Sequence, residues 1–498
     1  MGESQARLFE PTFNRSVKVE TKDERITSDG GVLLLREADH RLGLVESLAG
    51  QLDDPRNPDK IRYKLSELIR ERLYGMAQGY SAQDDADRLA HDPAFKIAVW
   101  DRRGEEVIQE RLASQPTQSR LVDVLSETGN REALRGSLGE WTNRHLRATG
   151  GDRSVRQATI DIDSFPLTVH GRQAGGAYNG HYQDTVYHPI VASLCSGGNY
   201  DNIRTGARLG NGFIHAVLRA GNVHTAQGSK RFLRNVIRKA RSMAWHFDLR
   251  LDAGFTSGKN MDFMTDEKVH FVGRLKTNSR LDALAEPHLK RPPGRPPKEG
   301  YQWVIELGSY RADSWRHAQR LILVVVDRPD PHSGQLFLMP EYFFLVTNYP
   351  PAMRSAEALL EHYRQRGTFE DRLGEFNQAI GPHLSQETFA ENEVTFLLGL
   401  LSYNLASCLR SELETDLGGC WDLARFRDNV LKVGGRVVKH SGRLLVYVAC
   451  AVSGFWSRLA SCLHAWKFPT SLTPPSGPQR RPWMPPPRHA HLQLVLRD

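Results

Sequence analysis

The stretch Ala158-Thr159-Ile160-Asp161-Ile162-Asp163-Ser164 decides the fold class of this chain. Apolar and acidic residues alternate in it, which predicts a strand that runs from Ala158 toward Val169. Ile160 and Ile162 point to one side of this strand, and Asp161 and Asp163 point to the other. Strands are depleted in Asp, and two adjacent carboxylates repel each other. The pair therefore needs an explanation, such as a bound cation.

The residues that follow predict the rest of a mixed sheet. Strand-like runs occur at 185–194, 202–209 and 270–275, a basic helix is expected at 229–245, and a short strand at 249–252 stops before Ala253-Gly254. Strands that first meander and then alternate with helices predict a mixed α/β sheet with helices on its faces. Asp252 lies where such a fold places its chemistry, at the carboxyl end of a strand. An Asp before Ala-Gly is comparably often only a turn residue.

Periodicity and composition divide the chain into six segments. We expect a mostly helical region at 1–150, a first part of the α/β domain at 151–276, a β-strand insertion with a basic Pro-rich loop at 277–345, a second part of the α/β domain at 346–415, a basic helical region at 416–467 and a Pro-rich tail at 468–498. The insertion is predicted from strand-like runs at 302–310, 320–326 and 342–347, and an apolar helix at 394–409 is suited to packing beneath the sheet.

Charge and cysteine content limit the class of protein. The chain has 498 residues, 40% of them hydrophobic, and a formal charge of +8. From Arg425 to the end it has 12 Lys and Arg against two Asp and no Glu, a net charge of +10. This excess predicts a polyanionic partner. Five cysteines without a C-x-x-C pair argue against a disulfide scaffold or a zinc ribbon. The N-terminus lacks the apolar segment of a signal peptide, and no run is long enough to span a bilayer, so we expect a soluble cytoplasmic protein.

A polar stripe is predicted further along. If residues 363–377 form one helix, Tyr363, Arg366, Glu370 and Asn377 share one face, because they are separated by three, four and seven positions. A carboxylate beside an Arg suits a site that holds a metal ion next to a phosphate. A solvated face with an i, i+4 Arg to Glu pair is the more common meaning of such a stripe taken alone.

Three acidic positions then stand out: Asp163 (or Asp161) on the first strand, Asp252 at a later strand end and Glu370 on a late helix. Converging carboxylates of this type bind two divalent cations roughly 4 Å apart, which activate an attacking hydroxyl and stabilise the leaving oxygen. This chemistry is in-line phosphoryl transfer on a nucleic acid. It needs few protein side chains, because the protein has only to position the reacting groups and neutralise the charge on the phosphate.

The order Asp, Asp, Glu, with Tyr363 and Arg366 preceding Glu370, resembles the DDE transposases of bacterial insertion sequences, and within them the insertion-sequence thirteen-eighty group. The resemblance covers roughly residues 25–460. It rests on five ordered motifs: Thr27-Ser28-Asp29-Gly30-Gly31, His91-Asp92-Pro93-Ala94-Phe95, Leu112-Ala113-Ser114-Gln115-Pro116-Thr117, Asp161-Ile162-Asp163-Ser164 and Ala177-Tyr178-Asn179-Gly180-His181-Tyr182.

The resemblance implies a ribonuclease H-like catalytic domain in which Asp163, Asp252 and Glu370 hold Mg²⁺, with Mn²⁺ as a substitute. Asp163 is preferred to Asp161, because the first carboxylate of the family commonly precedes a small hydroxyl residue, here Ser164; Asp161 would support the metal ligands. The implied partner is double-stranded DNA, both element ends and target, bound by a homodimer in the bacterial cytoplasm, at the nucleoid and not at a membrane. By analogy, residues 1–150 read the terminal inverted repeats.

The resemblance and the basic segments also give candidate DNA contacts. Tyr363 and Arg366 are expected on the DNA end, and further candidates are Asn377, Arg295, Lys276, Arg436 and Arg443. Residues 293–296, Pro-Gly-Arg-Pro, resemble an AT-hook core that enters the minor groove, although a flexible linker has the same composition. Trp303 or Trp315 would stack on an unpaired base, unless they pack on the insertion's own sheet, which is the more common role.

One position departs from the family signature. Asn377 stands where the signature has Lys, and an amide contributes no charge to a phosphate contact. Arg364, Arg366 or Arg372 would have to replace that cation. The departure keeps two alternatives open: a nuclease that cuts without joining, and a DNA-binding protein descended from a transposase that has lost catalysis.

Overall fold

The structure is a computed structural model. It describes residues 7–466, except for 15, 22, 103, 151–154, 170, 197–211, 292, 294–296, 298–299, 331–335, 338, 414–416 and 418–420. Residues 294–296 of the AT-hook-like segment, including Arg295, the run at 202–209 and the tail from 468 lie outside the described residues.

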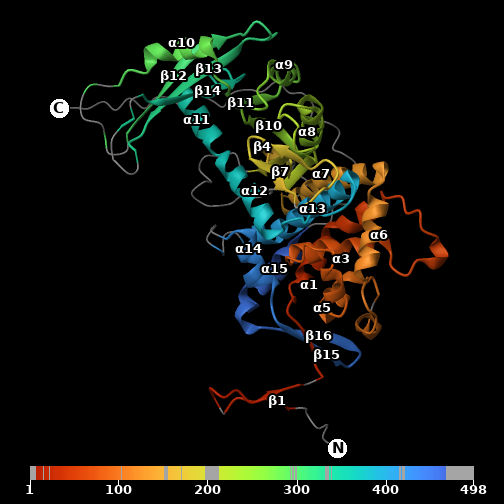
Figure 1. Cartoon of the computed structure of the whole chain (residues 1–498). Helices are drawn as coiled ribbons and strands as arrows, with labels where there is room; N and C mark the ends of the chain where they lie inside the picture. Colours follow the sequence, from red (N-terminus) through yellow and green to blue (C-terminus); the bar gives the residue numbers. More distant parts are fainter. Residues whose placement is uncertain are drawn as a thin grey trace, which may run out of the picture.

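An eight-stranded mixed sheet spans the upper part of the molecule in the view of Figure 1. Its strands in spatial order are β12 (Tyr301–Tyr310), β13 (Gln319–Asp327), β14 (Glu341–Thr347), β11 (His270–Leu275), β10 (Ala244–Leu251), β4 (Val155–Ser164), β8 (Ile190–Ser196) and β9 (Gly212–Val217). β10 is parallel to both β4 and β11, and the remaining pairs are antiparallel. The mixed α/β class is confirmed, and this strand order is compatible with a ribonuclease H-like domain.

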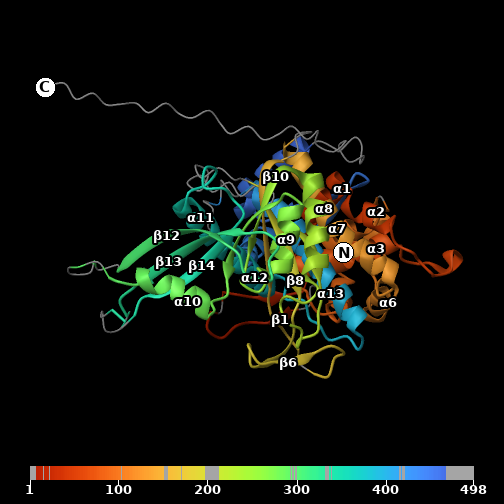
Figure 2. The same cartoon turned by 90° about the horizontal axis from the view of Figure 1, so that it is seen from above.

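Strand β4 has the predicted alternation. Ile160 and Ile162 are fully buried against α8 (Ser229–Met243) and α9 (Gly258–Asp266), which cover one face of the sheet. Asp161 and Asp163 point to the opposite face, where α11 (Ala356–Arg364), α12 (Gly367–Ala379) and α13 (Phe389–Glu412) lie (Figure 2). A strand buried on both faces by helices is typical of the parallel part of a mixed sheet.

The three strands of the expected insertion are present, but they do not form a sheet of their own. β14 pairs antiparallel with β11, so β12, β13 and β14 extend the central sheet. Trp303 donates its ring N–H to the carbonyl of His288 at 3.1 Å, and Trp315 packs against Gly258 and the ring of Tyr310. Both tryptophans therefore contribute to packing around the enlarged sheet.

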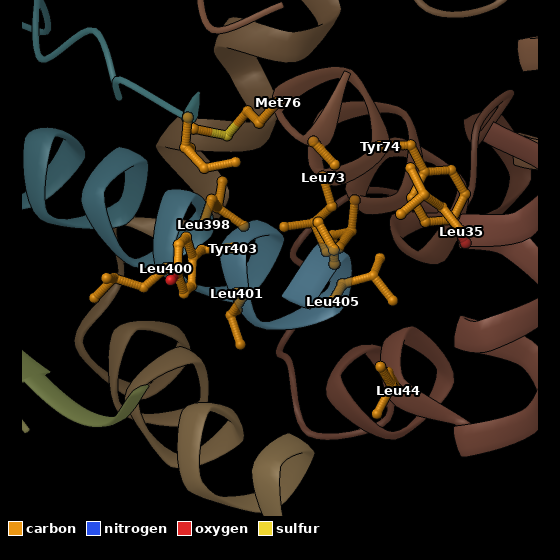
Figure 3. Close-up of a cluster of buried hydrophobic side chains, with 14 of the residues drawn as sticks. Leu35, Leu44, Leu73, Tyr74, Met76, Leu398, Leu400, Leu401, Tyr403 and Leu405 are labelled. Atoms are coloured by element: carbon orange, nitrogen blue, oxygen red, sulfur yellow. The ribbon is translucent and has the colours of Figure 1, made fainter. Parts of the chain in front are cut away.

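Helices dominate the N-terminal region and surround α13. They are α1 (Val32–Leu42), α2 (Leu44–Ala49), α3 (Leu65–Ala77), α4 (Asp85–Leu89), α5 (Pro93–Val99), α6 (Gln115–Leu125) and α7 (Thr128–Gly150). Helix α13 is apolar around most of its circumference, which is typical of a helix buried on all sides. Helix α13 packs on α3, with Leu405 of α13 near Leu73 of α3, while Leu401 points to the other side of α13 (Figure 3). One core therefore joins the N-terminal helices to the helices that cover the sheet.

The basic C-terminal region corrects an expectation, because it is not wholly helical. Helices α14 (Leu423–Phe426) and α15 (Ser453–Ala465) flank a hairpin of β15 (Gly435–His440) and β16 (Arg443–Val448). Its two-residue turn, Ser441-Gly442, has positive φ at both positions (50° and 74°), as a twisted hairpin requires. The apolar and basic residues at 435–448 form these two strands, and a search for helical periodicity does not detect them.

The two ends of the described chain meet. Strand β3 (Arg25–Thr27) pairs antiparallel with β15, and the amides of Gly30 and Gly31 donate to the carbonyls of Val433 and Leu431, both at 2.9 Å. A Cβ on Gly31 would lie 2.3 Å from the Cα of Leu431, so this close approach requires glycine. The Thr27–Gly31 motif thus has a structural role, which is to receive the C-terminal segment.

The remaining described elements are short: β1 (Arg7–Phe9), β2 (Val19–Glu20), β5 (Leu167–Thr168), β6 (Ala177–Asn179), β7 (Asp184–Tyr187) and α10 (Ser279–Ala285). β5, β7 and β6 form a small sheet beside the end of β4. In the described ranges, no helix has the length and apolar character needed to cross a bilayer.

Candidate active site

Asp163 and Asp252 lie side by side at one edge of the central sheet. Parallel strands β4 and β10 are in register at Ile162 and Leu251, and the next residue on each strand is one of the two aspartates. Asp252 begins the turn before α9, where its Oδ2 accepts the amide of Gly254 at 3.5 Å. The carboxyl ends of adjacent parallel strands therefore bring together two carboxylates that are 89 positions apart in the sequence.

The predicted polar stripe lies on two helices, not one. Helix α11 ends at Arg364 and α12 begins at Gly367. The amide of Arg366 bonds to the carbonyl of Tyr363, and that of Phe369 bonds to Arg366, at 2.9 and 2.8 Å. These are bonds to the third preceding residue, which tighten the chain as in a 3₁₀ turn. The expectation of one continuous helix is wrong at this junction, because the amides here bond to the third preceding residue instead of the fourth.

Arg366 joins the third carboxylate to the other two. Its guanidinium donates through Nη2 to Oδ2 of Asp163 and through Nη1 to Oε1 of Glu370. Arg366 is buried, whereas the side chain of Glu370 is 58% exposed. The helix stripe therefore does meet the paired-Asp strand, with Arg366 between Asp163 and Glu370.

The electrostatics of this cluster are those of a crowded acidic site. Burial raises the pKa of Asp163 to about 6; the positive charge of Arg366 opposes this shift, and the carboxylates of Asp252 and Glu370 add to it. Burial, and then the charge of Asp252, raise the pKa of Tyr363 to about 12 against the opposing effect of Arg366. A carboxyl group whose pKa is strongly shifted by burial and by a specific charged partner is typical of functional sites.

Tyr182 belongs to the same cluster, although sequence reasoning gave it no role. Burial raises the pKa of its phenol, and the charges of Asp163 and Asp252 raise it further. It lies in the turn between β6 and β7, in the 177–182 motif that helped to identify the family resemblance. That motif was the available signal for Tyr182.

The donor set suits a hard divalent cation by its chemistry. Asp163, Asp252 and Glu370 offer only carboxylate oxygens, which Mg²⁺ and Mn²⁺ prefer. Among the described residues, however, no three His, Cys, Asp or Glu side chains are already arranged as a set of metal ligands. The positive charge that these carboxylates meet within the chain is the guanidinium of Arg366.

Asp161 lies in the sheet interior and not at this edge. Its side chain is fully buried, and its two oxygens accept from Nε and Nη2 of Arg250 at 2.7 and 2.6 Å. This ion pair favours Asp163 as the first carboxylate of the site. Sequence reasoning missed Arg250, although charged and apolar residues alternate from Asp248 to Asp252 and give the same signal as in β4.

Arg250 also holds the junction of α11 and α12. Its Nη1 donates to the carbonyl of His362 at 3.0 Å and to Oε1 of Gln365 at 3.2 Å. The ring of His362 in turn contacts the buried carboxylate of Asp248. The polar face of β10 therefore fixes the segment from which Arg366 and Glu370 project.

Asn377 and the arginines considered as replacements for the signature lysine differ in how exposed they are. Asn377 is exposed on α12, about 10 Å along the axis from Glu370, and lines a hollow of about 370 Å³ with Thr168 and His383. Of the three arginines considered as replacements for a lysine at 377, Arg372 is buried against Ser193, and Arg366 lies between carboxylates. Arg364 alone of these three is exposed, and it donates to Glu361 and Gln302.

The basic candidates lie in two different places. Lys276 is exposed directly after β11, at the same edge of the sheet as Asp252. Arg436 and Arg443 are on the β15–β16 hairpin, at the end of the molecule far from β11 (Figure 1). Arg436 approaches Glu24 at 3.4 Å.

The sequence model of the family described as transposase DDE domain group 1 matches residues 9–463 of this chain. The chain belongs to this family. The matched range includes all three carboxylates of the cluster, and a search of curated proteins finds no match. Membership of the DDE transposase family supports a transposase function with DNA as the partner, and DDE transposases normally use divalent metal ions.

Proposed function

We propose that this DDE transposase moves an insertion sequence of the thirteen-eighty group. In this proposal it binds the terminal inverted repeats as a homodimer, cuts the element ends and joins their 3′ hydroxyls to target DNA. The observation that supports it best is the meeting of Asp163, Asp252 and Glu370 around Arg366 within the range matched by the family.

The three carboxylates would hold the divalent cations, Mg²⁺ or Mn²⁺, which supply an activated attacking oxygen and neutralise the leaving oxygen. Arg366 presents a planar guanidinium that forks onto phosphate oxygens. Tyr363, whose pKa is about 12, remains protonated near neutral pH and can donate its hydroxyl proton to a phosphate oxygen. The buried ion pair of Asp161 and Arg250 positions the helix junction that carries Tyr363, Arg366 and Glu370.

The rest of the chain supplies DNA contacts in this proposal. The helical region 1–150 reads the inverted repeats, and Lys276, Arg295, Arg436 and Arg443 neutralise backbone phosphates. Asn377 donates a hydrogen bond to the element end without adding charge. The domain that cuts is ribonuclease H-like, which the order of the five strands β9-β8-β4-β10-β11 supports.

The test is metal-dependent cleavage and joining of labelled terminal repeats. Asp163→Asn, Asp252→Asn and Glu370→Gln should each lower both products by at least about 100-fold, because each removes a charged ligand from the reacting centre. Glu361→Gln is the matched control, since it removes an exposed carboxylate from α11. Undiminished strand transfer by Glu370→Gln would sink the mechanism.

Asn377 gives a specific reason to test a second function, that of a DNA-binding protein without catalysis. Such a protein binds DNA in a salt-sensitive way but cuts nothing in Mg²⁺ or Mn²⁺. Cleavage that disappears in Asp252→Asn would exclude it. If cut ends accumulate without any joined product, the enzyme is instead a nuclease that does not transfer strands.

A further inference from the structure

Helix α8 presents a row of positive charges that the proposed chemistry does not use. Its buried side packs on the sheet through Phe232, Leu233, Val236, Ile237, Ala240 and Met243. Its exposed side carries Lys230, Arg231, Arg234, Arg238 and Arg241, and the helix has no acidic residue. These five side chains are called here the α8 ridge. Arg231, Arg234, Arg238 and Arg241 recur every three or four positions, as do Lys230 and Arg234, so the five lie along one broad face of the helix.

The ridge is mostly free of acidic partners. Among the described residues, Arg241 alone of the five forms a salt bridge, to Glu267 at 2.8 Å. Lys230 and Arg234 lie over the ring of Phe263, 5.6 and 5.9 Å from its centroid, which leaves their charge uncompensated. On an ordinary solvent-exposed helix face, acidic residues usually alternate with the basic ones and compensate their charge, and α8 has none.

One end of the ridge lies beside the carboxylate cluster. The segment before α8 touches the turn that follows Asp252, since a Cβ on Gly254 would lie 2.5 Å from Thr225. Ser229, the first residue of α8, accepts a hydrogen bond from the side-chain amide of Asn260 at 2.9 Å. The ridge therefore starts at the reactive edge of the sheet and extends about 17 Å from it, from Lys230 to Arg241.

The ridge and the catalytic helices lie on opposite faces of the sheet. α8 packs with α9 on the face of Ile160 and Ile162, whereas Arg366 and Glu370 reach the edge from the face of Asp163. A duplex held by Tyr363 and Arg366 would approach from the face of Asp163. The ridge is thus positioned for a different duplex at the same edge.

We propose that the α8 ridge binds the sugar-phosphate backbone of the target duplex, into which the element end is joined. This inference rests on the proposed function. Closely spaced Arg and Lys neutralise phosphates without reading bases, as target DNA of unrestricted sequence requires. The 17 Å length of the ridge is the rise of about five base pairs at 3.4 Å each.

The test measures the salt dependence of binding, without metal, to a random-sequence 30-base-pair duplex. Each phosphate contact contributes about 0.9 to the slope of log K against log salt. The triple variant Arg231→Gln, Arg234→Gln, Arg238→Gln of the full chain should therefore lower the slope by about 2.7. All three side chains are exposed, so the thermal unfolding temperature should match that of the wild type.

Two matched variants locate the effect. Lysine at the same three positions keeps the charge and should keep the slope. Arg280→Gln, Arg311→Gln, Arg316→Gln removes three exposed charges from α10 and the loop between β12 and β13, which have no DNA contact in the proposed function, and should leave most of the slope. An unchanged slope in the α8 triple variant, or an equal loss in this second triple variant, would overturn the assignment of the ridge to DNA.

A second readout separates target binding from the proposed function itself. With labelled element ends and a plasmid target, the ratio of joined to cut ends should fall at least about tenfold in the α8 triple variant. A normal ratio would overturn the assignment of the ridge to the target. Wild-type protein that neither cuts nor joins would refute the proposed function, while the salt slope would still decide whether the ridge binds DNA.

Discussion

Among the described residues, Arg366 links the two halves of the site. It is buried, and its two terminal nitrogens contact carboxylates that lie 207 positions apart in the sequence, Asp163 and Glu370. Strand alternation, the strand end before Ala253-Gly254 and helical spacing singled out Asp163, Asp252 and Glu370 as candidate carboxylates of one site. The sequence could not predict that the Arg of the stripe would contact Asp163, because that contact depends on the angle at which α12 crosses the sheet.

We expect Arg366→Lys to lower cleavage of the element ends by about 10- to 100-fold. An ammonium cannot reproduce the planar fork that contacts two carboxylates or two phosphate oxygens at once. Arg364→Lys is the matched control, since Arg364 lies two residues earlier and is exposed. Both variants keep the net charge, so equal cleavage rates for Arg366→Lys and the wild type would show that the fork geometry is not needed.

A second residue-level prediction concerns Glu71 on α3, away from the site. Burial raises its pKa to about 8, and Oε2 accepts from the amide of Ala113 at 3.2 Å and from Gln118 at 3.0 Å. The folded state then holds a proton that the unfolded state releases near its usual pKa of 4.5. The contribution of Glu71 to stability is therefore fully present below pH 4.5 and is lost as the pH rises to about 8.

The free energy of unfolding should thus fall by up to about 1.4 kcal/mol per pH unit in this window from Glu71 alone. Glu71→Gln should remove that part of the pH dependence, as measured by urea unfolding at pH 5, 6, 7 and 8. Glu132→Gln, an exposed carboxylate on α7, should leave the pH dependence as it is. A Glu71→Gln profile parallel to the wild type would contradict the assigned protonation.

At the scale of elements, the strands of the central sheet were more predictable than the helix junctions. Strand-like runs located β11, β12, β13 and β14 to within one residue of the observed ends, whereas β4 begins three residues before and ends five residues before the strand expected from Ala158 toward Val169. β13 is buried along its whole length, so a continuous apolar run was its signal. The break at 365–366 was not predictable, since residues 356–379 keep helical periodicity on both sides. The break coincides with the hydrogen bonds that Arg250 donates, which come from a strand more than 100 positions earlier.

Removing Arg250 should separate stability from activity. Arg250→Gln leaves Asp161 as a buried carboxylate without its ion-pair partner, which should cost about 3–5 kcal/mol in urea unfolding. Adding Asp161→Asn removes the buried charge and should restore most of that stability. Single-turnover cleavage should remain slow in the double variant, because His362 and Gln365 still lack their donor and Glu370 loses its position.

The ion pair of Arg131 and Arg135 with Glu393, between α7 and α13, is the matched control for this experiment. Glu393→Gln should lower stability but leave the cleavage rate per folded molecule at the wild-type level, since this pair does not contact α11 or α12. If the Asp161→Asn, Arg250→Gln variant cleaves as fast as the wild type, Arg250 stabilises the sheet without positioning the junction.

At the scale of the whole molecule, one core extends from the N-terminal helices to the sheet through α13. Leu401 is fully buried in it, the hydroxyl of Ser402 donates to the carbonyl of Leu73 on α3, and Asn404 pairs with the backbone of Phe213 on β9. The sequence predicted an apolar helix at 394–409 but not that it would touch both layers. An apolar surface on all sides shows that a helix is buried, but it does not identify its neighbours.

Leu401→Ala should therefore destabilise both layers together. The cavity left in a close-packed core should cost about 2–5 kcal/mol in urea unfolding. Hydrogen exchange should show lower protection in α3 and in β9 alike, since both pack on α13. Leu284→Ala is the control, because that side chain is exposed on α10. Loss of protection confined to one layer would show that the two layers unfold as separate units.

The pairing of β3 with β15 sets an order of events during synthesis. Thr27 leaves the ribosome about 400 residues before Gly435, and at 5–20 residues per second this interval is roughly 20–80 s. Throughout it, β3 and the Gly30-Gly31 turn lack the partner that completes them. A chain released early by a frameshift or a stop codon before residue 431 would keep this turn open, so the turn closes only in a chain that has been translated past β15.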